Sequence, residues 1–406
     1  MHYDLIIIGM GLSGLMAAKT AVEEGKRVLI IGKGIGTLSV FSNTIDVLGH
    51  LPEATGMSEG LSRWIDAHPE HPYTKIGRER IEEALSSFLS LFPSPYSFHA
   101  VGEGNCQVPT GAGTLRPTRY IPVTMTAGAS LKNGDPLIIG FNGFKDFYPG
   151  YMADHFQCRS IVLSLPELSH QEITATALAR WMERESFREK IGKEIKKQLK
   201  GETRVGFPAV LGMKGPFQVM KAFEDILGVK VFEIPILPPS IPGMRIFHRF
   251  KEWLIDKGVT FQLGHSVSEA VLRERRCEEI RVHNPPVVTS YTADQYILAT
   301  GRFIGGGLVA DQERISEPLF LLPVDQPGSR QEWFGKSFFG NPSHGIHSSG
   351  IRTDSSLRSI DENGNPLLQN VWIAGSILSG HHSLEEGSRE GISISTGYAA
   401  ARNAIK

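Results

Sequence analysis

Three glycines near the start of the chain have a spacing that suits nucleotide binding. Gly9, Gly11 and Gly14 form the pattern GxGxxG directly after the apolar run DLIII. In this pattern the first glycine permits a tight turn, the second lets the backbone approach a ligand, and the third lets a helix pack closely on a strand. Unpaired N–H groups at the start of the following helix attract negative charge. The spacing therefore predicts a site for the pyrophosphate of a dinucleotide.

The segments around this turn complete a strand–helix–strand unit. Residues 4–8 are typical of a buried strand, 15–24 of a helix, and 27–31 of a second buried strand. Glycine-rich loops also serve as plain tight turns, but one that lies between a strand and a helix favours dinucleotide binding. Leu12 and Ser13, which open the helix, are then expected to contribute backbone N–H groups to the cofactor site.

One part of the dinucleotide pattern is missing. The second strand usually ends in Asp or Glu, which holds the adenosine ribose, but this chain has Gly32 and then Lys33 there. Two interpretations stay open: the ribose is held in another way, or the site has changed its nucleotide preference. Lys33 is a candidate partner for a phosphate, although a solvated loop lysine is the simpler interpretation.

A second segment matches the plan of flavoproteins that combine two dinucleotide-binding motifs. The stretch TADQYILATG (292–301) is typical of a strand that ends at Ala299, Thr300 and Gly301. In such flavoproteins a strand ending in this way returns the chain to the first domain and passes close to the nucleotide. Thr300 and Gly301 are therefore candidate cofactor contacts.

A third segment near the C-terminus has the pattern that closes such folds. The stretch NVWIAGSILSG is typical of a buried strand that ends at Gly375, and Ser376 stands where Asp or Glu is usual. A helix begins near Glu390, with Gly391 and Ile392 in its first turn. In flavoproteins that helix N-terminus faces the flavin ring, where its dipole stabilises negative charge on the reduced ring.

Four further stretches resemble one family. They are GTLRPTRYIP (113–122), IPILPPSIPGMRI (234–246), GRFIGGGLVADQERISEPLF (301–320) and RQEWFGKSFF (330–339). With the motifs above, the chain resembles the B subunit of anaerobic glycerol-3-phosphate dehydrogenase along nearly its whole length. We therefore expect an α/β protein with a Rossmann-like two-dinucleotide-binding flavoprotein fold and an inserted α/β second domain. The flavin-binding domain would comprise 1–50, 244–310 and 350–406, and the inserted substrate or partner domain 51–243 and 311–349.

The resemblance implies a flavoprotein subunit that works with others. Its complex would oxidise sn-glycerol 3-phosphate to dihydroxyacetone phosphate and pass electrons to quinone. The implied partners are a catalytic FAD subunit and an iron–sulfur membrane-anchor subunit, which would hold this chain at the inner face of the cell membrane on the cytoplasmic side. The family is described as using FMN, which fits the missing ribose acid, whereas the intact glycine pattern favours FAD. FMN is our first expectation and FAD the alternative.

Several polar residues are candidates for chemistry or binding. Ser42 and Asn43 match the segment that passes flavin N5 in related folds, although turn formation explains them nearly as well. Arg116 could hold a phosphate or a carboxylate, or simply lie on the surface. His381 and His382 are candidates for a general acid or base near N5.

The remaining composition excludes several classes of protein. The chain has 406 residues and a formal net charge of −1, without the basic excess that binding to nucleic acid requires. It lacks an apolar stretch long enough to insert in a membrane. Its three cysteines are far apart, so we expect free thiols and neither a disulfide framework nor an iron–sulfur cluster. The HxxH pair His344 and His347 has no carboxylate at metal-ligand spacing, and no metal site is expected.

Two other functions stay open from the sequence alone. One is a self-sufficient flavin dehydrogenase, similar to fumarate reductase, that acts on its own small substrate. The other is a scaffold subunit whose flavin site is residual, because two acids of the flavoprotein pattern are replaced by Gly32 and Ser376.

Overall fold

The chain forms two compact units in the computed structural model, which describes residues 2–51, 55–131, 135–168, 172–284, 286–338 and 343–406. Unit 1 comprises Met1–Thr37, Ser58–Phe88 and Arg249–Lys406, and unit 2 comprises Leu38–Met57 and Leu89–His248. Among the described residues no helix is both long and apolar enough to cross a membrane.

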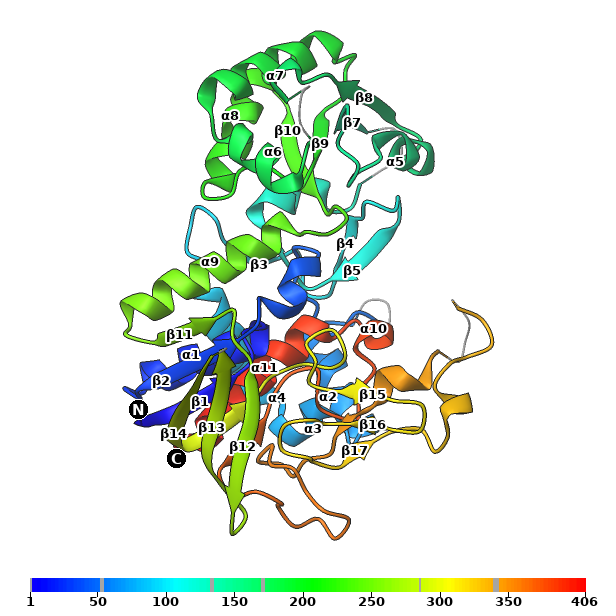
Figure 1. Cartoon of the computed structure of the whole chain (residues 1–406). Helices are drawn as coiled ribbons and strands as arrows, with labels where there is room; N and C mark the ends of the chain where they lie inside the picture. The colour runs from blue at the N-terminus through cyan, green and yellow to red at the C-terminus, as the bar shows by residue number, and fades with distance from the viewer. Residues whose placement is uncertain (1, 52–54, 132–134, 169–171, 285, 339–342) are drawn as a thin grey trace. The chain divides into compact units, whose positions relative to one another are not determined.

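Unit 1 is built on a seven-stranded sheet with the order β11-β2-β1-β14-β13-β12, in which β19 also pairs with β14 (Figure 1). Its strands are β1 (His2–Ile8), β2 (Val28–Gly32), β11 (Thr260–Leu263), β12 (Val267–Arg273), β13 (Arg276–Asn284), β14 (Val287–Leu298) and β19 (Val371–Ile373). β1, β2, β11, β19 and the second half of β14 pair in parallel, whereas β12, β13 and the first half of β14 pair antiparallel. β1, β2 and β19 are largely apolar and buried, as strands covered on both faces are, whereas β11 is partly exposed.

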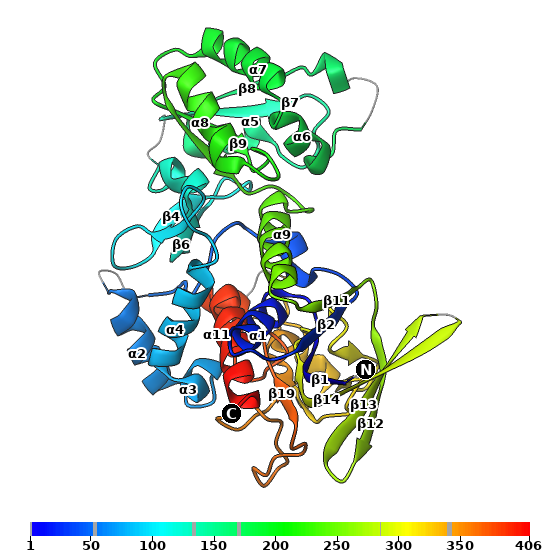
Figure 2. The ribbon, with the colours of Figure 1, turned by 90° about the vertical axis from the view of Figure 1, so that its left-hand side faces the viewer.

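Two helices of unit 1 lie side by side against the parallel strands, α1 (Leu12–Glu23) and α11 (Arg389–Ala404) (Figure 2). They approach closely because α11 presents Gly397 to α1. A Cβ atom at Gly397 would lie 2.3 Å from the backbone oxygen of Ser13. The start of α1 is therefore held by the C-terminal helix, more than 370 residues later in the chain.

The other helices of unit 1 include α2 (Met57–Ala67), α3 (Pro72–Ile76), α4 (Arg78–Leu89) and the short α10 (Ser383–Glu386). The amphipathic pattern of the sequence predicts one helix over Tyr73–Phe92, but the structure divides this stretch at Gly77, whose φ of +84° lies outside helical geometry. The loops of this unit carry the short strands β15 (Val309–Ala310), β16 (Ile315–Ser316), β17 (Val324–Asp325) and β18 (Gly350–Ile351), and the 3₁₀ helices η4 (Arg330–Glu332) and η5 (Gly345–Ser348).

Unit 2 is a second α/β layer, with a four-stranded parallel sheet of order β10-β9-β7-β8. The strands are β7 (Pro136–Phe141), β8 (Arg159–Leu163), β9 (Arg204–Pro208) and β10 (Lys230–Ile234), and the helices are α5 (Pro149–Phe156), α6 (Ala175–Met182), α7 (Glu185–Gln198) and α8 (Pro216–Leu227). The unit also has the antiparallel pairs β3 (Phe98–Ala100) with β6 (Tyr120–Pro122), and β4 (Cys106–Pro109) with β5 (Leu115–Thr118). The shorter 3₁₀ helices are η2 (Val123–Gly128) and η3 (Pro166–Leu168), and η1 (Gly36–Val40) spans the boundary at Thr37 and Leu38.

A buried ion pair stabilises unit 2 where α9 (Ile241–Asp256) begins. Arg245 donates two hydrogen bonds of 2.8 Å to the carboxylate of Glu233 on β10 and a third, also of 2.8 Å, to the backbone oxygen of Gly212. Glu233 is fully buried and Arg245 is 5% exposed. The pair fixes α9 to β10, because either charge left alone at this depth would be costly.

The boundaries of the two compact units differ from the boundaries of the expected domains. Residues 58–88 and 311–349 lie in unit 1, and 38–57 in unit 2. The reason is that α4 packs inside unit 1: Ser87 accepts a 2.9 Å hydrogen bond from Lys19 on α1, and the rings of Phe88 and Phe250 are 6.0 Å apart. The assignment of substrate and flavin roles to separate domains stays a prediction.

Candidate functional site

The glycine turn after β1 is shaped by close backbone contacts. Gly9 has a φ of +119°, and a Cβ there would lie 2.2 Å from the backbone oxygen of Ala299 at the end of β14. A Cβ at Gly14 would lie 1.9 Å from the backbone oxygen of Gly9. These two glycines are required for the chain to pass from β1 into α1, as the spacing predicts.

Gly11 has a different environment. It is the N-cap residue of α1, its φ of −70° suits any residue, and a Cβ there would meet no atom within 4 Å. No side chain caps the helix at this position, and its first turn has no acidic residue. The N–H groups at the start of α1 thus have no capping side chain from Gly11, and the helix dipole lies behind them. This cradle fits the pyrophosphate of a dinucleotide, and Leu12 and Ser13 stand in its first turn.

The three sequence segments predicted to form the cofactor site meet at this edge of the sheet. A Cβ at Gly375, after β19, would lie 2.5 Å from Oγ of Ser13, and one at Gly301, after β14, would lie 3.5 Å from Oγ of Ser376. Oγ1 of Thr300 is buried and has no hydrogen-bond partner among the described residues. A buried hydroxyl without a partner is a candidate for bonding to a ligand.

The first turn of α11 is packed into the core of unit 1. Gly391 is buried and its backbone oxygen accepts a 2.6 Å hydrogen bond from Ser395, while the side chain of Ile392 is 1% exposed. The backbone N–H of Ile392 already donates to the backbone oxygen of Ser388 at 2.9 Å, and its side chain serves the core, so the structure does not support Ile392 as a cofactor contact. Gly391 remains a candidate.

The end of β2 shows why the usual ribose acid is absent. A Cβ at Gly32 would lie 2.9 Å from Cγ and 3.0 Å from the backbone nitrogen of Met10. Met10 fills the space that a side chain at position 32 would need, so an acid there requires a different residue in the glycine turn. Lys33 follows and is exposed.

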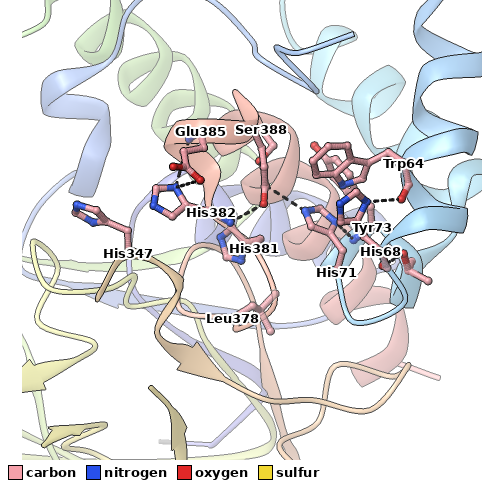
Figure 3. Close-up of polar contacts among 12 residues, drawn as sticks. Trp64, His68, His71, Tyr73, His347, Leu378, His381, His382, Glu385 and Ser388 are labelled. Carbon is pink, nitrogen blue, oxygen red and sulfur yellow. Dashed lines mark hydrogen bonds and ion pairs between the residues drawn. The ribbon is translucent and has the colours of Figure 1, made fainter. Parts of the chain in front are cut away.

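His381 and His382 lie in the loop that follows β19, within a group of polar residues (Figure 3). His381 is 3% exposed, and burial, followed by the nearby Arg302 cation, lowers its pKa well below 6.5. Nε2 of His382 is 2.9 Å from the hydroxyl oxygen of Ser343, and its Nδ1 accepts the N–H of Glu385 at 3.3 Å. His381 is thus a buried neutral ring and His382 a hydrogen-bonded one.

A glutamate anchors this loop. Glu386 contacts Nε2 of His71 at 3.2 Å, and it accepts the backbone N–H of His382 at 2.6 Å and the hydroxyl of Ser388 at 2.7 Å. Burial acts to raise the pKa of Glu386, but these hydrogen bonds bring it down to about 2. The side chain therefore stays ionised and holds the loop of residues 381–388 to His71, the N-cap of α3.

Arg302 is a functional candidate that the motifs did not single out. It follows Gly301 directly, and its guanidinium donates to the backbone oxygens of His347, Leu378 and His381, the last two at 3.1 Å. Burial lowers its pKa to about 10, against the raising effect of Glu386. Arg302 thus connects the segments after β14 and β19 with η5, at the edge where the cofactor segments meet.

Ser42, Asn43 and Arg116 belong to unit 2. Arg116 forms an ion pair with the buried Asp46, whose Oδ1 also accepts hydrogen bonds from Thr44 and Thr118. Asn43 has a φ of 66° and is fully buried, and both polar atoms of its side chain lack a partner among the described residues. The structure therefore gives Arg116 a partner within the chain and leaves Asn43 as an unsatisfied buried amide.

A cavity of about 680 Å³ in unit 2 has Ser42 and Arg116 in its wall. It lies next to the loops that follow β7 and β10, and most of its other lining residues are apolar, among them Phe147, Tyr151 and Ile236. Its size is in the range of small-molecule pockets. Across the part of the chain that the structure describes, no group of His, Cys, Asp and Glu residues could hold a metal ion.

Comparisons with known proteins give a matching family model and several relatives of this chain. Residues 4–392 match a family model described as an FAD binding domain. The chain is 30% identical to a protein of Halobacterium salinarum named as the probable B subunit of anaerobic glycerol-3-phosphate dehydrogenase, over 99% of this chain and 98% of that one. It is 28% identical to the corresponding B subunit of Vibrio cholerae, over 100% and 97%.

The solved structures that match include a 3-ketosteroid Δ1-dehydrogenase of Sterolibacterium denitrificans and a flavocytochrome c3 fumarate reductase. Their sequence identities are 11% and 9%, and their TM-scores are 0.46 and 0.47. The alignments cover all of this chain and 99% and 78% of those chains.

These matches test the expectations drawn from the sequence. The α/β flavoprotein fold and the family are confirmed. The choice of FMN as the first cofactor is not supported, because the matching family model describes a domain that binds FAD. This chain is a flavin-binding oxidoreductase that belongs to the FAD binding domain family and, within it, to the family formed by the B subunits of anaerobic glycerol-3-phosphate dehydrogenase.

Proposed function

We propose that this chain is the flavin-carrying subunit of an anaerobic glycerol-3-phosphate dehydrogenase complex. The complex oxidises sn-glycerol 3-phosphate to dihydroxyacetone phosphate and passes the electrons to quinone. The observation that carries the proposal is the open helix start at Gly11, enclosed by the close glycine contacts at Gly9, Gly14 and Gly375. The names of the relatives in Halobacterium and Vibrio support the substrate.

Within this proposal the cofactor is FAD. Backbone N–H groups of Gly11, Leu12 and Ser13 would hold the pyrophosphate, and Thr300, Gly301, Gly375 and Ser376 would line the path toward the flavin ring. A bound flavin supplies the capacity to accept two electrons. The chain would bind and orient it, and Arg302 would hold the surrounding loops in place through their backbone oxygens.

The missing ribose acid weakens FAD binding without preventing it. A charged hydrogen bond to the ribose contributes about 1.5–3 kcal/mol. Its loss lowers affinity by roughly tenfold to a hundredfold, while the contacts to the phosphates and the ring system remain. FMN has one phosphate and leaves half of the glycine cradle unused, so the cradle favours FAD.

The proposed partners follow from the designation of the relatives as one subunit of a dehydrogenase. They are a catalytic FAD subunit and an iron–sulfur subunit that anchors the complex at the cytoplasmic face of the membrane. Association with the membrane would then depend on the anchor subunit.

The test begins with the purified chain and its visible spectrum. Absorption bands of oxidised flavin are expected, and the flavin released by denaturation should run as FAD in chromatography. A colourless chain that stays colourless after incubation with FAD would support a scaffold role and contradict the proposal. Release of FMN alone would contradict the choice of cofactor but not the flavin site.

Adding sn-glycerol 3-phosphate anaerobically to the flavin-loaded chain, alone and with its partner subunits, tests the substrate. Loss of the flavin absorption is expected when the partner subunits are present, and little loss is expected for the chain alone, because the proposed complex has a separate catalytic subunit. Reduction by another small hydroxy acid, without reduction by glycerol 3-phosphate, would instead support a self-sufficient dehydrogenase.

A further inference from the structure

Another cavity lies within unit 1 and is lined mainly by polar side chains. Its volume is about 630 Å³. The wall is formed by the turn between α3 and α4, by the loop at Ser355 and Ser356, and by residues at the end of α11. Figure 2 shows α3 and α4 beside α11. None of these elements belongs to the segments predicted to hold the flavin, apart from the far end of α11.

Positive side chains dominate this wall. Lys75, Arg78 and Arg80 all line the cavity, together with one acidic side chain, that of Glu79. Three cations that share one hollow with one carboxylate make the potential inside it positive. Because α4 begins in the same wall, the dipole of that helix adds to the positive potential.

The ion pairs of two of these cations outside the cavity are weak. The ammonium of Lys75 is 3.7 Å from a carboxylate oxygen of Glu70, and Nε of Arg78 is 3.8 Å from one of Glu82. Both acidic side chains are more than half exposed. Water and salt screen such pairs, which contribute little energy. A ligand anion in the cavity could therefore compete with these carboxylates.

Lys75 is the most enclosed of the three cations. Its side chain is 12% exposed, and its ammonium donates a 2.9 Å hydrogen bond to the backbone oxygen of Thr353. Burial lowers the pKa of Lys75, and Glu70 offsets only part of this effect. An anion bound beside this ammonium would stabilise its charged form.

Arg80 has a neutral partner. Its guanidinium donates a 3.4 Å hydrogen bond to Oδ1 of Asn403, and Nδ2 of Asn403 donates to the backbone oxygen of Ser356 at 3.0 Å. No carboxylate lies within ion-pair distance of Arg80 among the residues that the structure describes. These bonds position the guanidinium at α11 without neutralising its charge.

A phosphate group suits this wall by its charge and its oxygen atoms. It carries one or two negative charges near neutral pH, and a planar guanidinium can donate two parallel hydrogen bonds to its oxygens. The cavity is large enough for a small organic molecule, so it also has room for the group to which the phosphate is attached.

We propose that this cavity binds a phosphate group, carried by a soluble phosphate ester or by the headgroup of an anionic phospholipid. Lys75, Arg78 and Arg80 bind its oxygens. The site needs neither flavin nor catalysis by this chain, so it goes beyond the proposed function. A lipid headgroup bound here would give the chain a membrane contact of its own, in addition to the proposed anchor subunit.

Calorimetry with inorganic phosphate at constant ionic strength tests the site on the purified full-length chain. Saturable binding is expected for wild type and for Gly11→Asp, whose added carboxylate keeps anions from the start of α1. Arg78→Gln combined with Arg80→Gln should weaken binding by about tenfold for each arginine removed. The matched control combines Arg63→Gln and Arg273→Gln, which remove two exposed arginines of the same unit, and it should match wild type.

Glu79→Gln tests the same wall in the opposite direction. Its carboxylate is exposed and repels an anion in the cavity, so its removal should strengthen phosphate binding by about two- to fivefold. Glu313→Gln, in an exposed loop of the same unit, is the control and should leave the affinity unchanged. This test remains decisive if the double arginine variant does not fold.

Co-sedimentation with vesicles distinguishes the two sources of phosphate. Retention by phosphatidylglycerol vesicles but not by phosphatidylcholine vesicles, lost in the double arginine variant, would identify a lipid headgroup. Phosphate binding without retention by either vesicle would identify a soluble ester. Absence of both kinds of binding, or equal binding by wild type, the double arginine variant and Glu79→Gln, would overturn the proposal. None of these readouts depends on flavin reduction, so the proposed function stands or falls separately.

Discussion

Replacing Gly11 by Asp should abolish flavin retention while leaving the fold intact. The backbone at Gly11 has a φ of −70°, and a Cβ there meets no atom within 4 Å, so the substitution introduces no strain. Asp is a favourable N-cap residue, and the unliganded protein should keep its stability within a few tenths of a kcal/mol. The added carboxylate would, however, occupy the position proposed for the pyrophosphate.

The size of the effect follows from charge. Two unit charges about 4 Å apart at an effective dielectric constant of 20 repel by about 4 kcal/mol, which is roughly a thousandfold in affinity. Gly11→Asn separates the contributions, because the amide fills the same space without the charge and should weaken binding less. Gly14→Ala serves as a folding control, since its Cβ would lie 1.9 Å from the backbone oxygen of Gly9.

The assay measures bound flavin per chain by absorbance and the thermal midpoint of the unliganded form. We expect Gly11→Asp to lose its flavin at an unchanged midpoint, and Gly14→Ala to show a lowered midpoint. Full flavin occupancy in Gly11→Asp would refute the assignment of the pyrophosphate to the start of α1.

Three further predictions concern stability. Arg245→Met should destabilise unit 2 by about 3–5 kcal/mol in urea unfolding, because Glu233 stays buried without its partner, and an unchanged midpoint would contradict a close ion pair. Gly397→Ala should cost about 1–3 kcal/mol, because its Cβ would press against the backbone of α1. The pKa of Glu386 is about 2 in the folded chain against an ordinary 4.5. The ionised carboxylate therefore adds about 3 kcal/mol to the free energy of unfolding at pH values above 4.5, and this contribution is lost as the pH falls through 2. Glu386→Gln should therefore show a weaker loss of stability between pH 4.5 and 2 than wild type in acid denaturation.

Local patterns in the sequence were sufficient to predict the elements that carry the cofactor site. The apolar run before Gly9, the glycine spacing and the helix after it define β1, α1 and β2 within about thirty residues, and the structure reproduces them to within a few positions. The final strand and helix were predicted for the same reason. Within the two large sheets, β10 and β12 lie outside the stretches that were expected to be strands, and Glu233 and Glu269 interrupt the apolar residues there. The short strands of the loops were not predicted either.

The polar group around Arg302 could not be predicted in the same way. Its hydrogen bonds reach residues 45, 76 and 79 positions later in the chain, and nothing in the local pattern connects them. The sequence identified the histidines as candidates by their residue type alone. Their hydrogen-bond partners, such as Gly335 for His344 and Ser343 for His382, depend on how the loops fold. The one local signal was an arginine placed directly after the ATG strand end.

The three glycines of the first turn also differ in a way that only the structure reveals, and the difference argues for a ligand. Gly9 and Gly14 are required by the packing of the chain itself, since any side chain there would overlap a backbone oxygen. Gly11 is required by nothing in the chain: its backbone angle suits alanine or serine, and the space beside it is open. At an N-cap, serine or aspartate is more favourable than glycine by about a few tenths of a kcal/mol, because its side chain caps the helix. We therefore infer that the glycine at this position serves a group outside the chain, one that needs the space and the N–H groups at the start of α1.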